Sequence, residues 1–166
     1  MRKNLKTLTI LCIALLVGCG GKEEKKEGFT LKKKQATENN AAVKTENVLA
    51  SKRIDLTNKG VGPITSVELP AEIDQAMVAH GQEIYNKMCT ACHRPDKKFI
   101  GPAQKGVLER RTPEWIMNMI LNPEEMLQKD PLAKELLVEF NNAPMANQNL
   151  TQEEARAILE YFRTLK

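Results

Sequence analysis

Histidine, cysteine and aromatic residues are all scarce in this chain of 166 residues. It has two histidines and four cysteines, and aromatic residues make up 4% of the chain. The main apolar stretch, residues 8–17, is too short to cross a bilayer as a permanent helix. No segment shows a convincing strand pattern. These shortages disfavour a zinc site with four ligands, a permanent transmembrane span and a β-sheet fold.

Excess charge of either sign is also missing from the C-terminal half. The chain carries a net charge of +4, which divides into about +3 for residues 1–18, +2 for residues 19–73 and −1 for residues 74–166. The positive charge therefore belongs to the N-terminal segments. It gives no support for nucleic-acid binding.

A signal for export occupies the N-terminus. A basic start leads into the apolar stretch, as in a secretory signal peptide. Residues 16–19, Leu-Val-Gly-Cys, resemble the lipobox of bacterial lipoproteins, which implies removal of residues 1–18 and lipidation of Cys19. The alternative is an ordinary secretion signal with a chance cysteine. Because Gly20 rather than Asp follows Cys19, we expect a lipid anchor in the outer membrane, with the remaining domain in the periplasm.

Three further segments follow the signal. Residues 19–53 are rich in Lys, Glu, Asn, Thr and Ala, so they predict a disordered tether that buries too little apolar surface to fold. Residues 54–73 are more apolar and predict an ordered lead-in segment, which either wraps onto the following domain or ends the linker. Residues 74–166 form the predicted domain.

The sequence Cys-Thr-Ala-Cys-His at residues 89–93 is the most informative motif. C-x-x-C-H is the attachment sequence for c-type haem. Residues three and four apart share one face of a helix, so the thiols of Cys89 and Cys92 can add to two vinyl groups while His93 reaches the iron. The motif therefore predicts one covalent haem c.

Three other interpretations use the same residues. A thioredoxin-like dithiol requires a βαβ setting, whereas helical periods surround Cys89 and Cys92. A zinc site requires four ligands, but the mature chain offers no second cysteine pair and, besides His93, only His80. A plain disulfide leaves His93 without a role.

The opposite face of the haem requires a second ligand. Met145 lies in an Asn-rich segment that predicts a loop without a hydrophobic period, so core packing does not explain a methionine there. It is our predicted ligand. Met126 is the second choice. Met117 and Met119 lie in an apolar helical segment, so we expect them in the core or in the wall of the haem pocket. His80 is too close in sequence to His93 to reach the far face.

Taken together, residues 74–166 resemble a class I monohaem cytochrome c. The resemblance rests on Gly81, Tyr85, the C-x-x-C-H motif, Gly101-Pro102, Met145 and an aromatic-bearing C-terminal helix. It implies that the carbonyl of Pro102 holds the Nδ1 atom of His93. One departure is that proline precedes Met145, whereas many relatives have it after the methionine.

Trp115, Arg110 and Arg111 are candidate partners of the haem propionates. A buried indole nitrogen requires an acceptor, and guanidinium groups suit carboxylates. The alternatives are a core position for Trp115 and solvated side chains for the arginines.

Helical patterns support an all-α, cytochrome c-like bundle of four to five helices. Apolar stripes run along residues 77–88 and 155–165, and Gly81 predicts close approach of the two helices. Thr112, Asn122 and Asp130 each precede a proline as caps, and Thr151 with Glu154 predicts a capping box.

The expected function is electron transfer in a bacterial respiratory chain, without enzymatic activity. Ligation by His93 and Met145 leaves no open iron position and raises the reduction potential. We expect a quinol-oxidising complex as donor and a terminal oxidase or nitrogen-oxide reductase as acceptor. The basic residues near the motif predict a patch that steers an acidic partner, and the alternative is a solvated loop; these residues are Arg94, Lys97, Lys98 and Lys105. The alternative is a haem-based sensor or peroxidase-like protein with an open or labile sixth position.

Overall fold

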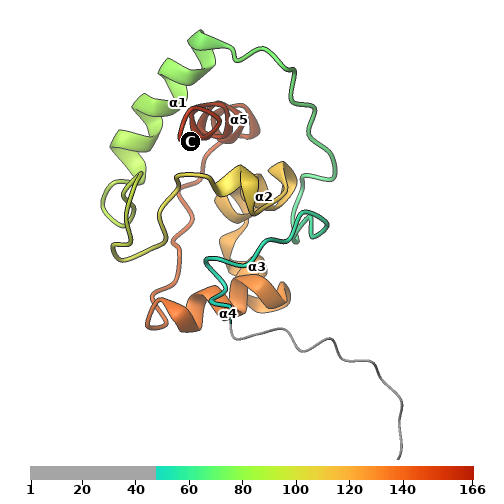
Figure 1. Ribbon diagram of the computed structural model, residues 1–166, viewed down its shortest axis with the longest axis vertical. Coiled ribbons are helices and arrows are strands. Elements are labelled where there is room, and N and C mark those ends of the chain that lie inside the picture. Colours follow the sequence, from blue (N-terminus) through green and yellow to red (C-terminus); the bar gives the residue numbers. More distant parts are fainter. Residues whose placement is uncertain (1–47) are drawn as a thin grey trace, which may run out of the picture. The chain divides into compact units, whose positions relative to one another are not determined.

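The computed structural model describes residues 48–166 (Figure 1). The helices follow one another as α1 (Gln75–Met88), the 3-10 helix η1 (Val107–Glu109), α2 (Pro113–Leu121), α3 (Pro123–Lys129), α4 (Pro131–Glu139) and α5 (Gln152–Phe162). This part of the chain has no strand and only one isolated bridge, between Asp55 and Arg111. These five α-helices confirm the predicted all-α bundle of four to five helices.

The structure does not describe most of the N-terminal segments. The predicted signal peptide, the predicted lipidation site Cys19 and most of the predicted tether lie outside the described residues. Among the helices of residues 48–166, none has the length and apolar character needed to cross a membrane.

The first and last helices pack against each other (Figure 1). Gly81 lies at their contact, where a Cβ atom would come within 2.0 Å of the carbonyl oxygen of Ala157. Only glycine allows this approach, because any side chain would overlap the backbone of α5. The predicted close approach at Gly81 is confirmed.

Side-chain caps begin most of the helices. Thr112 accepts from the backbone N–H of Trp115 at 3.1 Å, and Asp130 from that of Ala133 at 2.7 Å. The capping box of Thr151 and Glu154 is complete. Asn122 is the exception to the predicted caps, because its amide nitrogen donates to the Glu125 carboxylate instead of its oxygen capping α3.

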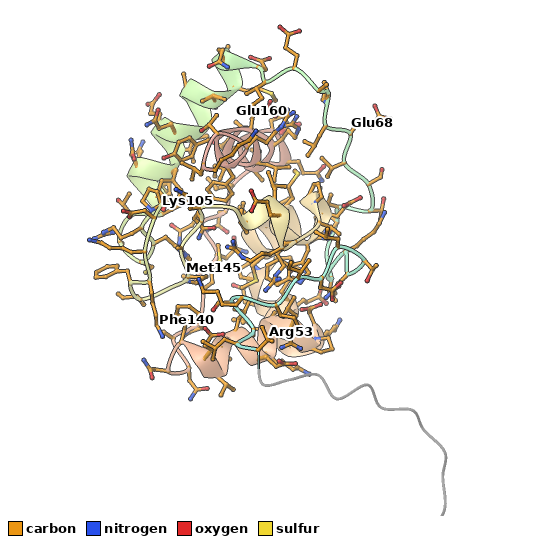
Figure 2. The ribbon with its side chains drawn as sticks, viewed as in Figure 1. Arg53, Glu68, Lys105, Phe140, Met145 and Glu160 are labelled. Carbon is orange, nitrogen blue, oxygen red and sulfur yellow. The ribbon has the colours of Figure 1, made fainter. Side chains whose placement is uncertain are left out.

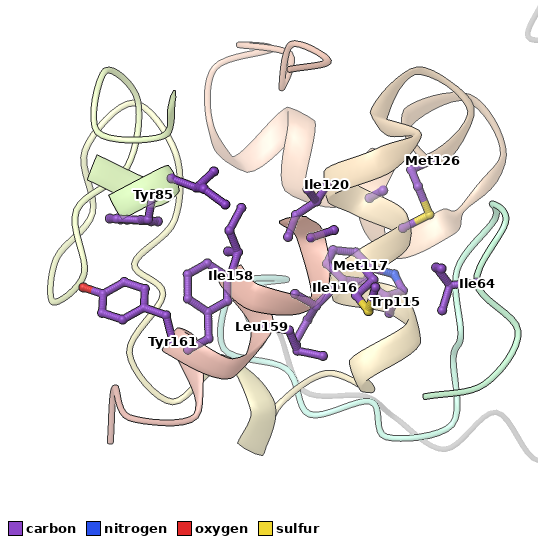
Figure 3. Close-up of a cluster of buried hydrophobic side chains, with 14 of the residues drawn as sticks. Ile64, Tyr85, Trp115, Ile116, Met117, Ile120, Met126, Ile158, Leu159 and Tyr161 are labelled. Carbon is purple, nitrogen blue, oxygen red and sulfur yellow. The ribbon is translucent and has the colours of Figure 1, made fainter. Parts of the chain in front are cut away.

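The buried core joins α2 and α5 to the aromatic side chain of α1 (Figure 3). Tyr85 packs at 5.4 Å from Tyr161 and 5.8 Å from Phe162, measured between ring centroids. Ile158 and Leu159 are fully buried beside them. This core forms one wall of the space in which the motif residues lie.

The lead-in segment, residues 54–73, packs on the helices. Of its two predicted alternatives, the structure therefore has the one in which it wraps onto the domain. Ile64 is buried, and its backbone N–H and carbonyl both bond to the side chain of Asn118. Ordered contacts begin a few residues before position 54, since Ser51 donates to Glu139 of α4 and Arg53 pairs with Glu135.

Candidate functional site

The motif forms a turn that continues the end of α1. The N–H of Cys89 donates to Tyr85, and the N–H groups of Cys92 and His93 donate to the carbonyl of Cys89 at 3.1 and 2.9 Å. Both cysteines are free thiols. The turn that follows α1 thereby presents two sulfurs and one imidazole within five residues.

The glycine-proline pair holds the imidazole from one side. Nδ1 of His93 lies 3.0 Å from the carbonyl oxygen of Pro102, as the resemblance implied. A Cβ atom on Gly101 would come within 2.5 Å of Cε1 of His93, so the glycine backbone lies directly against the ring. The N–H of Gly101 also donates to the carbonyl of Cys92 at 2.9 Å. These contacts fix the ring and leave Nε2 as the nitrogen available to a metal.

Burial determines the protonation of His93 and of Cys89. It lowers the pKa of His93, against the opposing effect of the Pro102 hydrogen bond, so the imidazole is neutral at pH 7 as a metal ligand must be. Burial, together with Cys92, raises the pKa of the Cys89 thiol to about 11. Dithiol redox proteins require the opposite shift. The thioredoxin-like interpretation is therefore disfavoured, as it is by the absence of strands from residues 48–166.

One cavity of about 200 Å³ brings the predicted site residues together. Its walls come from all five α-helices, from η1 and from the loops around them. The predicted site residues that line it are Cys89, Cys92, His93, Pro102, Trp115 and Met145. Within residues 48–166, no three His, Cys, Asp or Glu side chains group as ligands of a metal ion, which leaves the zinc interpretation without a ligand set there.

Met145 lies in the loop between α4 and α5 (Figure 2). Three asparagines of this loop, Asn141, Asn142 and Asn149, have positive φ angles of 54–59°, a conformation that asparagine tolerates better than most residues. Met145 is partly buried and packs against the core. The loop thus places Met145 at the same cavity as His93.

The other candidate ligands lie on helices, where they have different surroundings. Met126 is fully buried, and its sulfur accepts the N–H of Val61 at 2.9 Å. Met117 is a core residue, whereas Met119 lines the cavity as a wall. His80 is exposed on α1. None of these four lies as Met145 does, on a loop facing the motif.

The indole nitrogen of Trp115 has a protein partner. It donates to Oδ1 of Asp130 at 3.2 Å, so the predicted hydrogen bond to a propionate is replaced by one inside the protein. Arg111 is buried over the Trp115 ring and donates to the carbonyls of Ala50 and Arg53. Arg111 and Arg110 both line the cavity and keep their predicted place as candidate anion partners.

The sequence analysis gave two cavity residues no role at the site. Tyr85 was named for the apolar stripe and for the family resemblance, yet its buried hydroxyl has no hydrogen-bond partner among residues 48–166. The signal was its position four residues before Cys89, on the same helical face. Gln104 lies against His93, at 2.8 Å from Nδ1, and its sequence context gave no such indication.

These residues fit a covalently bound haem. Two thiols and an oriented imidazole line a mainly apolar cavity, and the unpartnered Tyr85 hydroxyl would gain contact with a group filling that space. Gly101 adds a flat surface behind the imidazole. The donor set is that of c-type attachment.

Comparisons with known proteins agree with this site. The family model described as Cytochrome c matches residues 78–166. Cytochrome c from Rhodothermus marinus is 43% identical in sequence, with a TM-score of 0.61, and the match covers 70% of this chain and 93% of that one. The chain belongs to the cytochrome c family. An engineered Rhodothermus marinus cytochrome c bound to a carbene intermediate is also 43% identical, with a TM-score of 0.59 over 70% of this chain and 94% of that one. A search of curated proteins found no match.

Membership of the cytochrome c family establishes the cofactor. Proteins of this family bind haem c covalently through a cysteine pair, and Cys89 and Cys92 have the C-x-x-C-H spacing. The family is one of haem-based electron transfer. The cytochrome c domain therefore accounts for the cavity and for the free thiols at its edge.

Proposed function

We propose that this cytochrome c is an electron carrier of a bacterial respiratory chain, with His93 and Met145 as its two axial ligands. The observation that carries the proposal is the single cavity lined by Cys89, Cys92, His93 and Met145. When bound, the haem supplies a one-electron couple between ferric and ferrous iron. Histidine with methionine gives a higher reduction potential than two histidines, which suits a carrier that passes electrons to a terminal acceptor.

The protein holds this couple in one geometry. Cys89 and Cys92 attach the cofactor, and Pro102 and Gly101 orient the imidazole. The mainly apolar lining of the cavity would leave little solvent to reorganise when the charge changes. With His93 and Met145 as ligands, side chains would fill both axial positions, which favours a carrier over an enzyme.

Exposed residues beside the cavity suit a protein partner. Ile100 lines the cavity and is 48% exposed. Next to it, Arg94 stacks on the exposed ring of Phe99 at 4.1 Å, and Lys98 lies 4.6 Å from the ring of Phe140. Such an edge would attract acidic redox partners, for which we propose a quinol-oxidising complex as donor and a terminal oxidase or nitrogen-oxide reductase as acceptor. Electron-transfer rates with either partner should then fall as salt increases.

We place the haem domain in the periplasm, tethered through residues 19–53 to a lipidated Cys19 in the outer membrane. The lipobox-like residues 16–19 support this part of the proposal. Replacing residues 1–19 with a secretory signal that has an ordinary cleavage site and no lipobox should move the mature protein from the membrane fraction to the soluble fraction. A protein that stays with the membranes would refute the lipid anchor and leave the haem site unaffected.

The axial ligands are tested by absorption spectroscopy of the purified, exported protein. The oxidised form should show the far-red sulfur-to-iron band, and Met145→Ala should abolish it. Met119→Ala is the matched control, because Met119 lines the same cavity from α2 and should leave the band in place. A band that survives in Met145→Ala would refute the ligand assignment, and ready binding of carbon monoxide to the ferrous wild type would favour the sensor or peroxidase-like alternative.

A further inference from the structure

Gln104 makes a contact at the proximal histidine that family membership does not explain. Its amide nitrogen lies 2.8 Å from Nδ1 of His93 and 3.2 Å from the carbonyl oxygen of Pro102. The Nδ1 atom lies 3.0 Å from the same oxygen. Three polar groups therefore meet behind the ring of the ligand.

The backbone around Gln104 is held in place. The carbonyl of Gln104 accepts the N–H of Val107 at 3.0 Å, at the start of η1. The next N–H, that of Lys105, donates to the carbonyl of Pro95 at 2.7 Å. The side chain itself is half-buried and lines the cavity. Its position against His93 is thus supported from both sides.

The proton positions follow from the chemistry of the ring. A neutral imidazole that binds iron through Nε2 carries its proton on Nδ1, so Nδ1 donates to the Pro102 oxygen. The Gln104 amide also donates to this oxygen. In the reverse amide orientation, the Gln104 oxygen would instead be a second acceptor for the Nδ1 proton, and Gln104 would then lower the potential. In the orientation that the structure gives, two donors share the Pro102 oxygen and crowd each other.

We propose that Gln104 is a positioning residue that raises the reduction potential by weakening the hydrogen bond from His93 to Pro102. A strong bond from Nδ1 makes the imidazole a better electron donor, which favours ferric iron. Competition from the Gln104 amide reduces this effect and favours ferrous iron. The inference rests on the proposed role of His93 as iron ligand.

The decisive variant is Gln104→Leu in the full chain loaded with haem. Leucine removes the competing donor at similar size, so the midpoint potential should fall. Simple loss of a polar group from the cavity has the opposite effect, because an apolar surrounding favours the less charged ferrous state. Gln148→Leu is the matched control, since Gln148 lines the same cavity on the loop that carries Met145 and bonds to Ala146 instead of His93. Its potential should stay unchanged or rise.

A second variant and a second readout complete the test. Gln104→Glu offers Nδ1 a carboxylate acceptor and should lower the potential further than Gln104→Leu, so either variant tests the proposal if the other does not mature. In NMR spectra of the ferrous protein, the Nδ1 proton of His93 should move downfield in both variants. A potential that rises or stays constant in the Gln104 variants, or an Nδ1 resonance that does not move, would overturn the inference. A wild-type spectrum without histidine ligation would refute the proposed axial ligand itself.

Discussion

The contact between α1 and α5 at Gly81 predicts an unusually large effect of a single methyl group. The Cβ atom of Gly81→Ala would lie 2.0 Å from the carbonyl oxygen and 2.4 Å from the carbonyl carbon of Ala157. Both atoms belong to backbone, so relief requires the two helices to separate by more than an ångström. Overpacking of a core costs about 1–3 kcal/mol, and we expect the upper part of this range. The gain in helix propensity, about 1 kcal/mol, opposes it.

Chemical denaturation of the haem-loaded protein, followed by far-UV circular dichroism, measures this net loss of about 1–2 kcal/mol. Ala79→Gly is the control, because Ala79 is exposed on the same helix and should lose about 1 kcal/mol through propensity alone. The two substitutions are opposite in chemistry, yet both should destabilise. An increase in stability for Gly81→Ala would show that propensity dominates and would refute the close contact.

Three other substitutions test the site and its support. Gly101→Ala should displace the imidazole of His93, because the added methyl group would lie 2.5 Å from Cε1, and absorption spectra should then show loss of histidine ligation. Burial alone would raise the pKa of Glu160, but hydrogen bonding to Arg156 and other partners holds it below its usual 4.5. The folding stability should therefore fall as the pH falls below 4.5. Glu160→Gln should flatten this dependence in denaturation curves at pH 3–5 and should lower the stability at pH 7 by about 2 kcal/mol. Burial raises the pKa of Tyr85 to about 12, so folding stability should fall as the pH rises above the ordinary value of 10, and Tyr85→Phe should lessen that loss in alkaline denaturation.

The parts of the fold that could be predicted are those with a local physical cause. Helix starts followed from Thr112, Asp130 and Thr151, whose side chains bond to N–H groups three residues later. The close approach at Gly81 followed from the unfavourable placement of glycine inside a helix. For the site, Cys89 to His93 are adjacent in sequence, so their common orientation needed no knowledge of the fold.

Contacts that depend on tertiary structure could not be predicted in the same way. Trp115 was a candidate partner of a propionate or a core residue, and nothing in its sequence surroundings indicated that Asp130, fifteen residues later, would accept its N–H. Asn122 precedes a proline as a cap does, but its side chain is drawn to Glu125. The contact of Gln104 with His93 depends on how the loop after the motif folds back, and a glutamine has no characteristic pattern that would indicate it.

The lead-in segment shows the same limit most clearly, because its stability comes from side chains far along the chain. Residues 59–64 have no helix or strand of their own, so their backbone groups require other partners. Asn118 bonds to the carbonyl of Lys59 and to both backbone groups of Ile64, and the sulfur of Met126 accepts the N–H of Val61. Because the partners sit on α2 and α3, the conformation of the segment depends on the position of these helices. The segment covers their outer side, which extends a core that contains few aromatic residues.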